Sequence, residues 1–290
     1  MIEDIRTVSL PKAEDERGNL SYIEGLQHIP FRPQRAYWIY DVPGGEVRGS
    51  HAYRRAQEFI VALSGSFDVT LEDKNGNRRQ ISLNRSYNGV YVPAQTWRTL
   101  ENFSTNALGL ILSSTPYEED DYVWQKSELE TLPAPIAETL PEPQLPEDKC
   151  RWGVDDCKVI ELPALTELRR GYLTAVNEMS ADLPFPLRRI FYIYDIPSGS
   201  IRGAHAHYKA WQAIVAASSS FEVVVDDGEK TRTFRLDRPY RMLLVPPGIW
   251  CHLHDFASAS VALVLTSEYF SKEDYISSWP EFLDYKRHQG

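Results

Sequence analysis

An internal repeat limits what this chain can fold into more than any other feature of the sequence. The segment RAYWIYDVPGGEVRGSHAY begins at Arg35 and aligns without gaps to RIFYIYDIPSGSIRGAHAH, which begins at Arg189. The offset is 154 positions (189 − 35), and it becomes 153 after one deletion, so that Asp121-Tyr122 matches Asp274-Tyr275. The chain therefore contains two copies of one domain.

The 290 residues are enough for two domains of ~150 residues each. We expect an N-terminal domain over residues 1–130, a linker over 131–149 and a C-terminal domain over 150–290. The predicted linker reads TLPAPIAETLPEPQLPEDK. It is rich in proline and acidic residues, and such a composition favours an extended connector.

Each copy contains short runs of alternating apolar residues, rich in β-branched and aromatic side chains, which predict β-strands. Examples in the second copy are IFYIYDI, FEVVVDD and SVALVLTS. The segments at 72–77 and 226–230 are typical of hairpin turns. Only the domain ends have a helical pattern, as in SKEDYISSW from Ser271. We therefore predict an all-β chain of two tandem jelly-roll barrels (double-stranded β-helices), with short helices at the domain ends.

The composition argues against several classes of partner. Lys and Arg total 31 against 41 Asp and Glu, so the net charge is −10, and no basic run favours nucleic acid or an anionic membrane. No segment approaches the ~18 consecutive apolar residues of a membrane-spanning helix. The N-terminus has no signal-peptide pattern, and three cysteines are too few for a disulfide framework. We expect a protein of the cytoplasm.

The densest polar chemistry lies on the predicted strand that carries Arg202, His205 and His207. Because alternate residues of a strand share a face, both histidines are predicted to point into one cavity and Ala206 away from it. Paired imidazoles at this spacing suit either metal binding or acid–base catalysis.

Paired histidines on such a strand occur in metal-binding barrels of the cupin type, which add a carboxylate and a later histidine. Neither copy has the full set, because Tyr53 replaces the second histidine in the first copy and Gln212 replaces the carboxylate in the second. At the later position the copies have Arg98 and Cys251. Two further candidates could complete the second copy, His252 and His254. Since a stable site wants about three or four protein ligands, we predict no metal, and a metal-dependent dioxygenase is the less favoured alternative.

The run RRIFYIYDIPSGSIRGAHAH, followed by VPPGIWCHLHDFAS and LTSEYFSKEDYI, resembles the cupin sugar 3,4-ketoisomerases over nearly the whole of each copy. The resemblance implies that the chain isomerises dTDP-4-dehydro-6-deoxyglucose to its 3-keto isomer for deoxyaminosugar biosynthesis. It implies no metal and no cofactor. Members of that family are homodimers that exchange N-terminal strands, so the tandem chain looks like such a dimer fused into one chain.

The same resemblance implies that His205 and His207 are catalytic. The residues that it implies for substrate binding are Arg189, Tyr192, Arg202, Trp250 and His254. The matching residues of the first copy are Arg35, Arg48, His51, Tyr53 and Trp97. There Tyr53 stands in place of His207, and the ordinary pKa of tyrosine is ~10 against ~6.5 for histidine. We therefore expect the second copy to carry the catalysis and the first to hold a degenerate site.

Several alternatives stay open from the residues alone. Arg202 could form a structural ion pair with Asp195, and Arg48 with Asp41. Trp250 and Tyr192 could be ordinary core aromatics rather than stacking surfaces for the thymine or the sugar. At the level of function, the alternatives are a related dTDP-sugar epimerase and a non-catalytic protein that binds nucleotide sugars.

Overall fold

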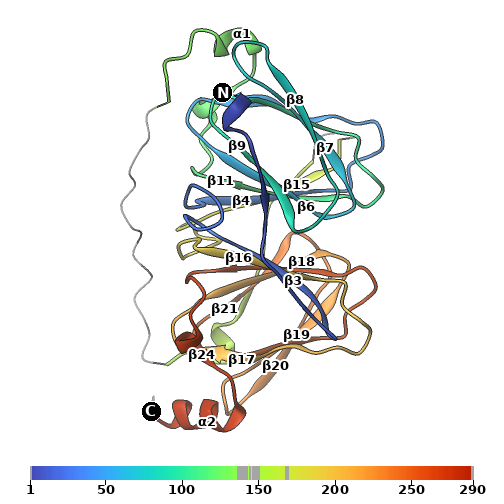
Figure 1. The fold of residues 1–290 in the computed structure, drawn as a ribbon. Helices are drawn as coiled ribbons and strands as arrows, with labels where there is room; N and C mark the ends of the chain where they lie inside the picture. The colour runs from blue at the N-terminus through green and yellow to red at the C-terminus, as the bar shows by residue number, and fades with distance from the viewer. Residues whose placement is uncertain (1, 136–142, 144, 146–150, 167–169, 289–290) are drawn as a thin grey trace. The chain divides into compact units, whose positions relative to one another are not determined.

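The computed structural model describes residues 2–135, 143, 145, 151–166 and 170–288. Most of the predicted linker at 131–149 lies outside the described residues. The chain divides into two compact β units, and each unit contains segments of both repeats (Figure 1). Unit 1 comprises residues 1–11, 25–142 and 163–178, and unit 2 comprises 12–24, 143–162 and 179–290.

Unit 1 consists of two antiparallel sheets with short helices at its ends. Its strands are β1 (Arg6–Ser9), β4 (Arg35–Tyr40), β5 (Arg48–Tyr53), β6 (Glu58–Ser64), β7 (Phe67–Glu72), β8 (Arg78–Leu83), β9 (Asn88–Val92), β10 (Trp97–Glu101), β11 (Leu108–Ser113), β12 (Tyr122–Val123), β14 (Ala164–Thr166) and β15 (Tyr172–Asn177). Its helices are η1 (Ile2–Asp4), η2 (Glu119–Asp121) and α1 (Lys126–Leu129). One sheet has the order β1-β9-β6-β11-β4-β15-β14 and the other has the order β12-β5-β10-β7-β8.

Unit 2 repeats this plan. Its strands are β2 (Lys12–Asp15), β3 (Gly18–Glu24), β13 (Lys158–Glu161), β16 (Arg189–Tyr194), β17 (Arg202–His207), β18 (Gln212–Ser218), β19 (Phe221–Asp226), β20 (Thr231–Leu236), β21 (Arg241–Val245), β22 (Trp250–His254), β23 (Val261–Thr266) and β24 (Tyr275–Ile276). Its helices are η3 (Val154–Asp156), η4 (Lys272–Asp274) and α2 (Trp279–His288). The sheets have the orders β13-β21-β18-β23-β16-β3-β2 and β20-β19-β22-β17-β24.

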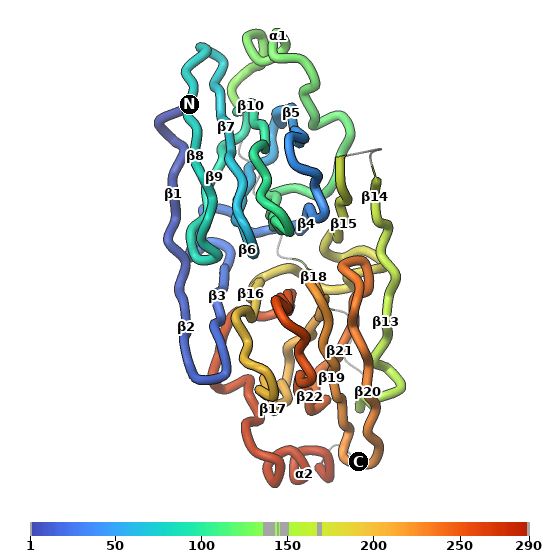
Figure 2. The backbone as a smooth tube through the Cα atoms, turned by 90° about the vertical axis from the view of Figure 1, so that its right-hand side faces the viewer, coloured from blue at the N-terminus to red at the C-terminus, as the bar shows by residue number. Residues whose placement is uncertain are grey.

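The two outermost strands at one edge of each seven-stranded sheet come from the other repeat of the sequence. In unit 2, β3 pairs with β16, so that Tyr22 lies opposite Phe191. In unit 1, β15 pairs with β4, so that Ala175 lies opposite Tyr37. Figure 2 shows β2 and β3, in blue, beside β16, and β14 and β15 beside β4. Residues of the first repeat therefore form part of the barrel wall of unit 2.

The core of each unit lies between its two sheets. Strands such as β18 and β23 are buried along almost their whole length, which explains their continuous apolar sequences. Strands of the five-stranded sheets alternate, as β19 does with Phe221, Val223 and Val225 buried. The prediction of an all-β chain with two cupin-type barrels is confirmed. No helix in the described part of the chain is long and apolar enough to cross a membrane.

Candidate active site

A pocket of about 250 Å³ lies in the barrel of unit 2. The side chains that line it are Arg17, Leu20, Arg189, Phe191, Ile193, Arg202, His205, Gln212, Ile214, Cys251, Leu253, Val264, Phe270 and Tyr275. Most of these side chains are apolar, and the polar ones include three arginines and one histidine. A concave apolar cavity with a few polar groups is the usual form of a small-molecule site.

A β-bulge in β17 decides which side chains of this strand enter the pocket. The register with β22 shifts between Gly203 and His205, so that Arg202 lies opposite Leu253 and His205 opposite Cys251. Both partners line the pocket, and the bulge therefore places Arg202 and His205 on one face although they are three residues apart. Gly203 has a φ of 81°, and a Cβ there would lie 2.9 Å from the carbonyl oxygen of Cys251. Glycine is required at this position.

His205 is the one histidine among the lining residues. Burial, and then the charge of the neighbouring His207, lower the pKa of His205 to about 4. Its ring lies 4.8 Å from the ring of Tyr275, centroid to centroid. At neutral pH His205 is therefore an uncharged imidazole at the pocket wall, the state that a general base needs.

His207 lies beside His205, with ring centroids 5.0 Å apart, but it does not line the pocket. Its Nδ1 is 3.0 Å from the Asp274 carboxylate, and its Nε2 is 3.0 Å from Nε2 of Gln212. A carboxylate can only accept, so Nδ1 carries the proton, and Nε2 accepts from the Gln212 amide. Both ring nitrogens of His207 are thus used in holding the ring in place. Ala206 packs on the other face of the strand against Ile276, as predicted.

The three arginines stand in different surroundings. Arg189 is buried, and its guanidinium lies 4.9 Å from the ring of Phe191 and 5.2 Å from that of Phe270. Arg202 pairs with Asp15 at 2.8 Å, and the other carboxylate oxygen of Asp15 pairs with Arg17 at 2.7 Å. Arg17 is more than half exposed. Hydrogen bonding to Arg17 lowers the pKa of Asp15 to about 2.

The alternative ion pair proposed for Arg202 is therefore wrong. Its partner is Asp15, which lies on the hairpin of β2 and β3 in unit 2, and Asp195 instead accepts a hydrogen bond from Asn19 at 2.9 Å. In unit 1, Arg48 donates to the carbonyl oxygen of Arg170 at 2.7 Å. Sequence spacing within one repeat could not show these contacts, because each partner lies in the other repeat.

Three residues expected to bind substrate face away from the pocket. On β22 the lining residues are Cys251 and Leu253, so Trp250 and His254 lie on the opposite face of the sheet. Trp250 packs against Trp279 of α2 at 5.4 Å, and Nε2 of His254 lies 3.7 Å from Glu222. These placements contradict the predicted pocket position of both residues.

Tyr192 is also outside the pocket. Arg189, Phe191 and Ile193 of β16 line the cavity, and Tyr192 is fully buried on the other face, 5.9 Å from the ring of Tyr194. It is a core aromatic, the alternative that the residues had left open. The lining residues that sequence reasoning missed include Arg17, Phe270 and Tyr275. For Tyr275 a signal was available, since the Asp-Tyr pair recurs in both repeats.

The matching interior of unit 1 contains a buried ion pair. Arg98 stands in the place of Cys251 and Glu58 in the place of Gln212, with exposed fractions of 2% and 1%. Nε of Arg98 donates to Glu58 at 2.6 Å, and Nη2 donates to the hydroxyl of Tyr37 at 2.8 Å. Such a pair is held by mutual charge compensation and hydrogen bonds. In unit 1 the Arg98–Glu58 pair thus stands at the positions that line the open pocket in unit 2.

The other residues of the expected degenerate site are only partly together. The ring of His51 lies 5.0 Å from that of Tyr53 and 4.9 Å from that of Tyr122. Arg35 donates to the Tyr122 hydroxyl at 3.1 Å. Trp97 packs with the buried residues Ala52, Val123 and Leu129 on the outer face of its sheet. It does not join His51.

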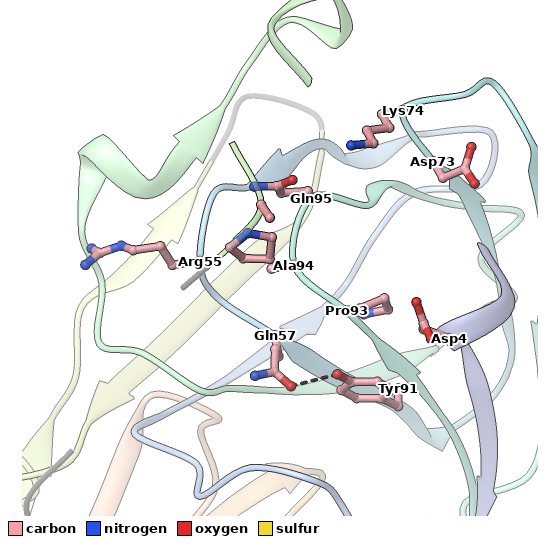
Figure 3. A pocket seen from close by; sticks show the side chains of 11 residues that line it. Asp4, Arg55, Gln57, Asp73, Lys74, Tyr91, Pro93, Ala94 and Gln95 are labelled. Atoms are coloured by element: carbon pink, nitrogen blue, oxygen red, sulfur yellow. Dashed lines mark hydrogen bonds between the residues drawn. The ribbon is translucent and has the colours of Figure 1, made fainter. Parts of the chain in front are cut away.

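A second hollow, of about 430 Å³, lies in unit 1, and Figure 3 shows the side chains that line it. The hydroxyl of Tyr91 donates there to Oε1 of Gln57 at 2.7 Å, and Asp73 also lines the hollow. The residue of unit 2 that matches Gln57 is Trp211, whose ring packs 4.8 Å from that of Trp152. The two units therefore differ here, and none of the predicted site residues lines this hollow.

Across the residues that the structure describes, no group of three or more His, Cys, Asp or Glu side chains is arranged to hold a metal ion. His252 and His254 lie beside each other with ring centroids 5.6 Å apart. They stand on the face of β22 that points away from His205. They are therefore not placed to complete a ligand set with it.

The fold and the site together define a β protein of two cupin-type barrels, with a basic pocket around one uncharged histidine in unit 2. A family model described as FdtA, WxcM-like, C-terminal, matches residues 3–132 and 155–287. The chain belongs to this family, and it contains two copies of the family's domain. The resemblance to the cupin sugar 3,4-ketoisomerases is thereby confirmed.

Individual relatives match about half of the chain. The TDP-4-oxo-6-deoxy-α-D-glucose-3,4-oxoisomerase of Aneurinibacillus thermoaerophilus is 38% identical over 128 residues, which cover 44% of this chain and 91% of that protein. A 3,4-ketoisomerase from Helicobacter canadensis is 32% identical, covers 44% of this chain and 95% of its own, and has a TM-score of 0.42. QdtA is a sugar 3,4-ketoisomerase from Thermoanaerobacterium thermosaccharolyticum that was solved with TDP. It is 26% identical, the match covers 46% of this chain and 96% of QdtA, and the TM-score is 0.44.

Proposed function

We propose that unit 2 is a 3,4-ketoisomerase site for a dTDP-linked 4-keto-6-deoxyglucose. The observation that carries this proposal is the uncharged His205 on the wall of a pocket that also contains three arginines. Family membership supports it, because the curated relative is named as an oxoisomerase of TDP-4-oxo-6-deoxyglucose.

The reaction moves protons only. His205 removes the proton from C3, and the electron pair of that C–H bond forms the C3–C4 double bond of an enediolate. The hydroxyl proton passes from the oxygen on C3 to the oxygen on C4. The proton held by His205 exchanges with solvent, and protonated His205 then donates a solvent-derived proton to C4. The C3 oxygen becomes the ketone, so no external oxidant or reductant is consumed. A buried histidine with a lowered pKa is present as the free base at neutral pH.

His207 serves in this proposal as a positioning residue rather than as a second base. Its two nitrogens are held by Asp274 and Gln212, and a proton shuttle would have to break these hydrogen bonds. The edge-to-face contact with His205 fixes the base beside the pocket. The Tyr275 hydroxyl, 3.4 Å from Nη1 of Arg189, is the protic group that we propose for hydrogen bonding to the enediolate oxygens.

In this proposal Arg189 lies beside the sugar, and Arg17 and Arg202 lie beside the nucleotide. A cavity of about 250 Å³ is smaller than the ~300–1,000 Å³ of most complete small-molecule sites, so we place only the sugar inside it. The diphosphate then lies at the mouth, where Arg17 is exposed and Arg202 is close by. Thymine contacts by Trp250 or His254 are not part of the proposal, because both face away from the pocket.

We propose further that the enzyme needs no metal or cofactor and works in the cytoplasm, and that the exchanged hairpins make the chain an intramolecular counterpart of a dimer. The reaction only moves protons and consumes no oxidant or reductant, which supports the proposal that no metal or cofactor is needed. The sheet order, in which each unit contains strands of both repeats, supports the proposal that the chain is an intramolecular counterpart of a dimer. Turnover should be unchanged after exhaustive treatment with EDTA.

The test is incubation of the full chain with dTDP-4-keto-6-deoxyglucose in deuterated water, followed by NMR of the sugar. Isomerisation should give a 3-keto product with deuterium at C4. Deuterium at C3 or C5 with the ketone still at C4 would instead show an epimerase. An unlabelled sugar that binds without change would show a non-catalytic binding protein, and either result would overturn the proposal.

A further inference from the structure

Two arginines at matching positions of the units differ in their charge compensation. Arg189 of unit 2 has Glu24 beside it, with Oε1 3.8 Å from its Nε. The strand registers place Glu24 opposite Arg189 and Asn177 opposite Arg35. Unit 1 thus has an uncharged amide where unit 2 has a carboxylate.

Asn177 keeps the structural role that Glu24 has in unit 2 and lacks only its charge. Oε1 of Glu24 accepts a hydrogen bond from the backbone N–H of Phe270 at 2.6 Å. Oδ1 of Asn177 accepts the matching bond from the backbone N–H of Tyr117 at 3.1 Å. The backbone is therefore held in the same way in both units, and the difference between them at this point is electrostatic.

Arg35 is a buried cation that forms no ion pair with any residue that the structure describes. It is 6% exposed, donates from Nη1 to the Tyr122 hydroxyl at 3.1 Å, and lies over the rings of Tyr37 and Tyr117. Its Nε, like that of Arg189, has no hydrogen-bond partner among the described residues. No carboxylate among the described residues lies within ion-pair distance of it. Because guanidinium stays charged and burial of an unpaired charge is unfavourable, this position favours an anionic ligand.

A second buried polar atom in the same cluster also lacks a partner. His51 is 8% exposed, and its Nε2 forms no hydrogen bond. Its ring contacts those of Tyr122 and Trp124 at 4.9 and 5.3 Å. Burial and the nearby guanidinium groups hold the pKa of His51 well below its ordinary value, so Nε2 belongs to a neutral ring that can hydrogen-bond a ligand.

An exposed aromatic surface lies next to these two groups. Trp124 is 61% exposed and stacks on Tyr122 at 5.1 Å with an interplanar angle of 14°. Tyr117 is 53% exposed. At the position of Trp124 the second repeat has Ser277 (124 + 153). Exposed aromatic faces of this kind bind nucleobases by stacking.

We propose that unit 1 is a second binding site for a nucleoside diphosphate, with the phosphates at Arg35 and the base on Trp124, and that a ligand there is not turned over. The choice of dTDP as the nucleotide rests on the proposed function. The positive charge of Arg35 and the exposed ring of Trp124 define the ligand class, a nucleoside diphosphate. Turnover is absent because Tyr53 replaces His207 and the Arg98–Glu58 pair occupies the space that the sugar takes in unit 2.

Isothermal titration calorimetry of the full chain with dTDP tests the proposal. The wild-type chain should bind two dTDP molecules, and Arg35→Met should bind one. The control in unit 2 is Arg202→Met, which removes an arginine that we place beside the diphosphate there, and it should lose the other site. A second variant, Asn177→Glu, installs the carboxylate that unit 2 already accommodates as Glu24, and it should weaken the first site roughly tenfold or more with the fold intact.

One dTDP per wild-type chain, or two undiminished sites in both Arg35→Met and Asn177→Glu, would overturn the proposal. Inorganic diphosphate and thymidine should each bind to the first site more weakly than dTDP. Diphosphate binding there as tightly as dTDP would refute the role of Trp124. Failure of the proposed function is recognised separately, since it appears as two bound dTDP molecules without conversion of the keto sugar.

Discussion

His205 and His51 occupy matching positions in the two units, and their surroundings separate them. His205 lines an open pocket, whereas His51 lies under Tyr122 and Trp124 beside an interior that contains Arg98 and Glu58. The same residue type in the same strand can therefore be a base in one unit and part of a binding cluster in the other.

Replacing the two histidines should have unequal effects. General acid–base groups contribute ~10²–10⁴-fold to turnover, so His205→Asn should lower kcat by about that factor. His51→Asn should lower kcat by less than about tenfold. The measurement is kcat for both variants, with circular dichroism to show that each is folded. Equal losses in the two variants would contradict a single catalytic unit.

The titration of His205 should appear in both activity and stability. Its pKa is about 4 in the folded chain, because of burial and His207, against ~6.5 when unfolded. Between these two pKa values, His205 binds more protons in the unfolded chain than in the folded one. The contribution of His205 to the free energy of unfolding is therefore constant above about pH 6.5 and falls as the pH is lowered towards 4. The loss is on the order of 3 kcal/mol. kcat/KM should hold down to about pH 5 and fall below it.

Thermal unfolding of the wild type and of His205→Gln between pH 7.5 and 4.5 checks this prediction. The variant should lose less stability on acidification, because it lacks one of the histidines with a lowered pKa. The same acid-induced decrease in both proteins would show that His205 is not the group responsible.

The residues that sequence reasoning placed wrongly have one physical cause in common. Trp250, His254 and Tyr192 were placed in the pocket by resemblance alone, but the side of a sheet that a strand residue faces is set by register. Cys251 and Leu253 of β22 and Phe191 of β16 face inward, and their sequence neighbours face outward. Alternation on the His-x-His strand placed His205 at the pocket and Ala206 on the other face, but the prediction that His207 points into the same cavity is wrong, because His207 does not line it.

At the scale of the element, the bulge in β17 is the feature that builds the site. Gly203→Ala should destabilise the chain, because its φ of 81° is unfavourable for alanine and the Cβ would approach the Cys251 carbonyl at 2.9 Å. Gly199→Ala is the matched control, since Gly199 has a φ of 80° with open space around its Cβ position. We expect a loss of about 1 kcal/mol for Gly199→Ala, and a further loss of similar size or more for Gly203→Ala.

Denaturant unfolding and kcat measure the two glycine variants. Gly203→Ala should also lose activity, because relaxing the bulge turns His205 or Arg202 away from the pocket. Equal stability losses with full activity in both variants would mean that the bulge does not position the base.

The hairpin of β2 and β3 is a second element that the site depends on. It brings Arg17 and Leu20 of the first repeat to the pocket of unit 2, and it supplies Asp15 to Arg202. No pattern within either repeat indicates these contacts, because strand pairing across more than 150 residues is decided by packing of the whole sheet.

At the scale of the whole molecule, each unit is made from both halves of the sequence. If a protease site is introduced between the repeats, within residues 136–150, cleavage should leave two fragments that stay together. The reason is that β3 remains paired with β16 and β15 with β4. Size-exclusion chromatography of the cleaved protein should give one peak that contains both fragments, and activity should persist.

Each fragment expressed alone should be insoluble or unfolded, because its seven-stranded sheet lacks two strands. Two cleaved fragments that separate as folded, independently stable proteins would contradict the pairing. The uncleaved chain that carries the same inserted site is the control.

The sequence by itself determined the two-fold repeat, the all-β class, the hairpin turns at 72–77 and 226–230, and the strand that carries His205. These follow from local alternation and turn chemistry, which act over a few residues. Only the tertiary structure decided that Asp15 rather than Asp195 pairs with Arg202, that His207 is held by Asp274 and Gln212, and that Arg35 lacks the carboxylate that Arg189 has. Those facts depend on register, on a bulge and on strands of one repeat that pair with strands of the other. Such long-range pairings are selected by the packing of complete sheets rather than by the residues next to them in the chain.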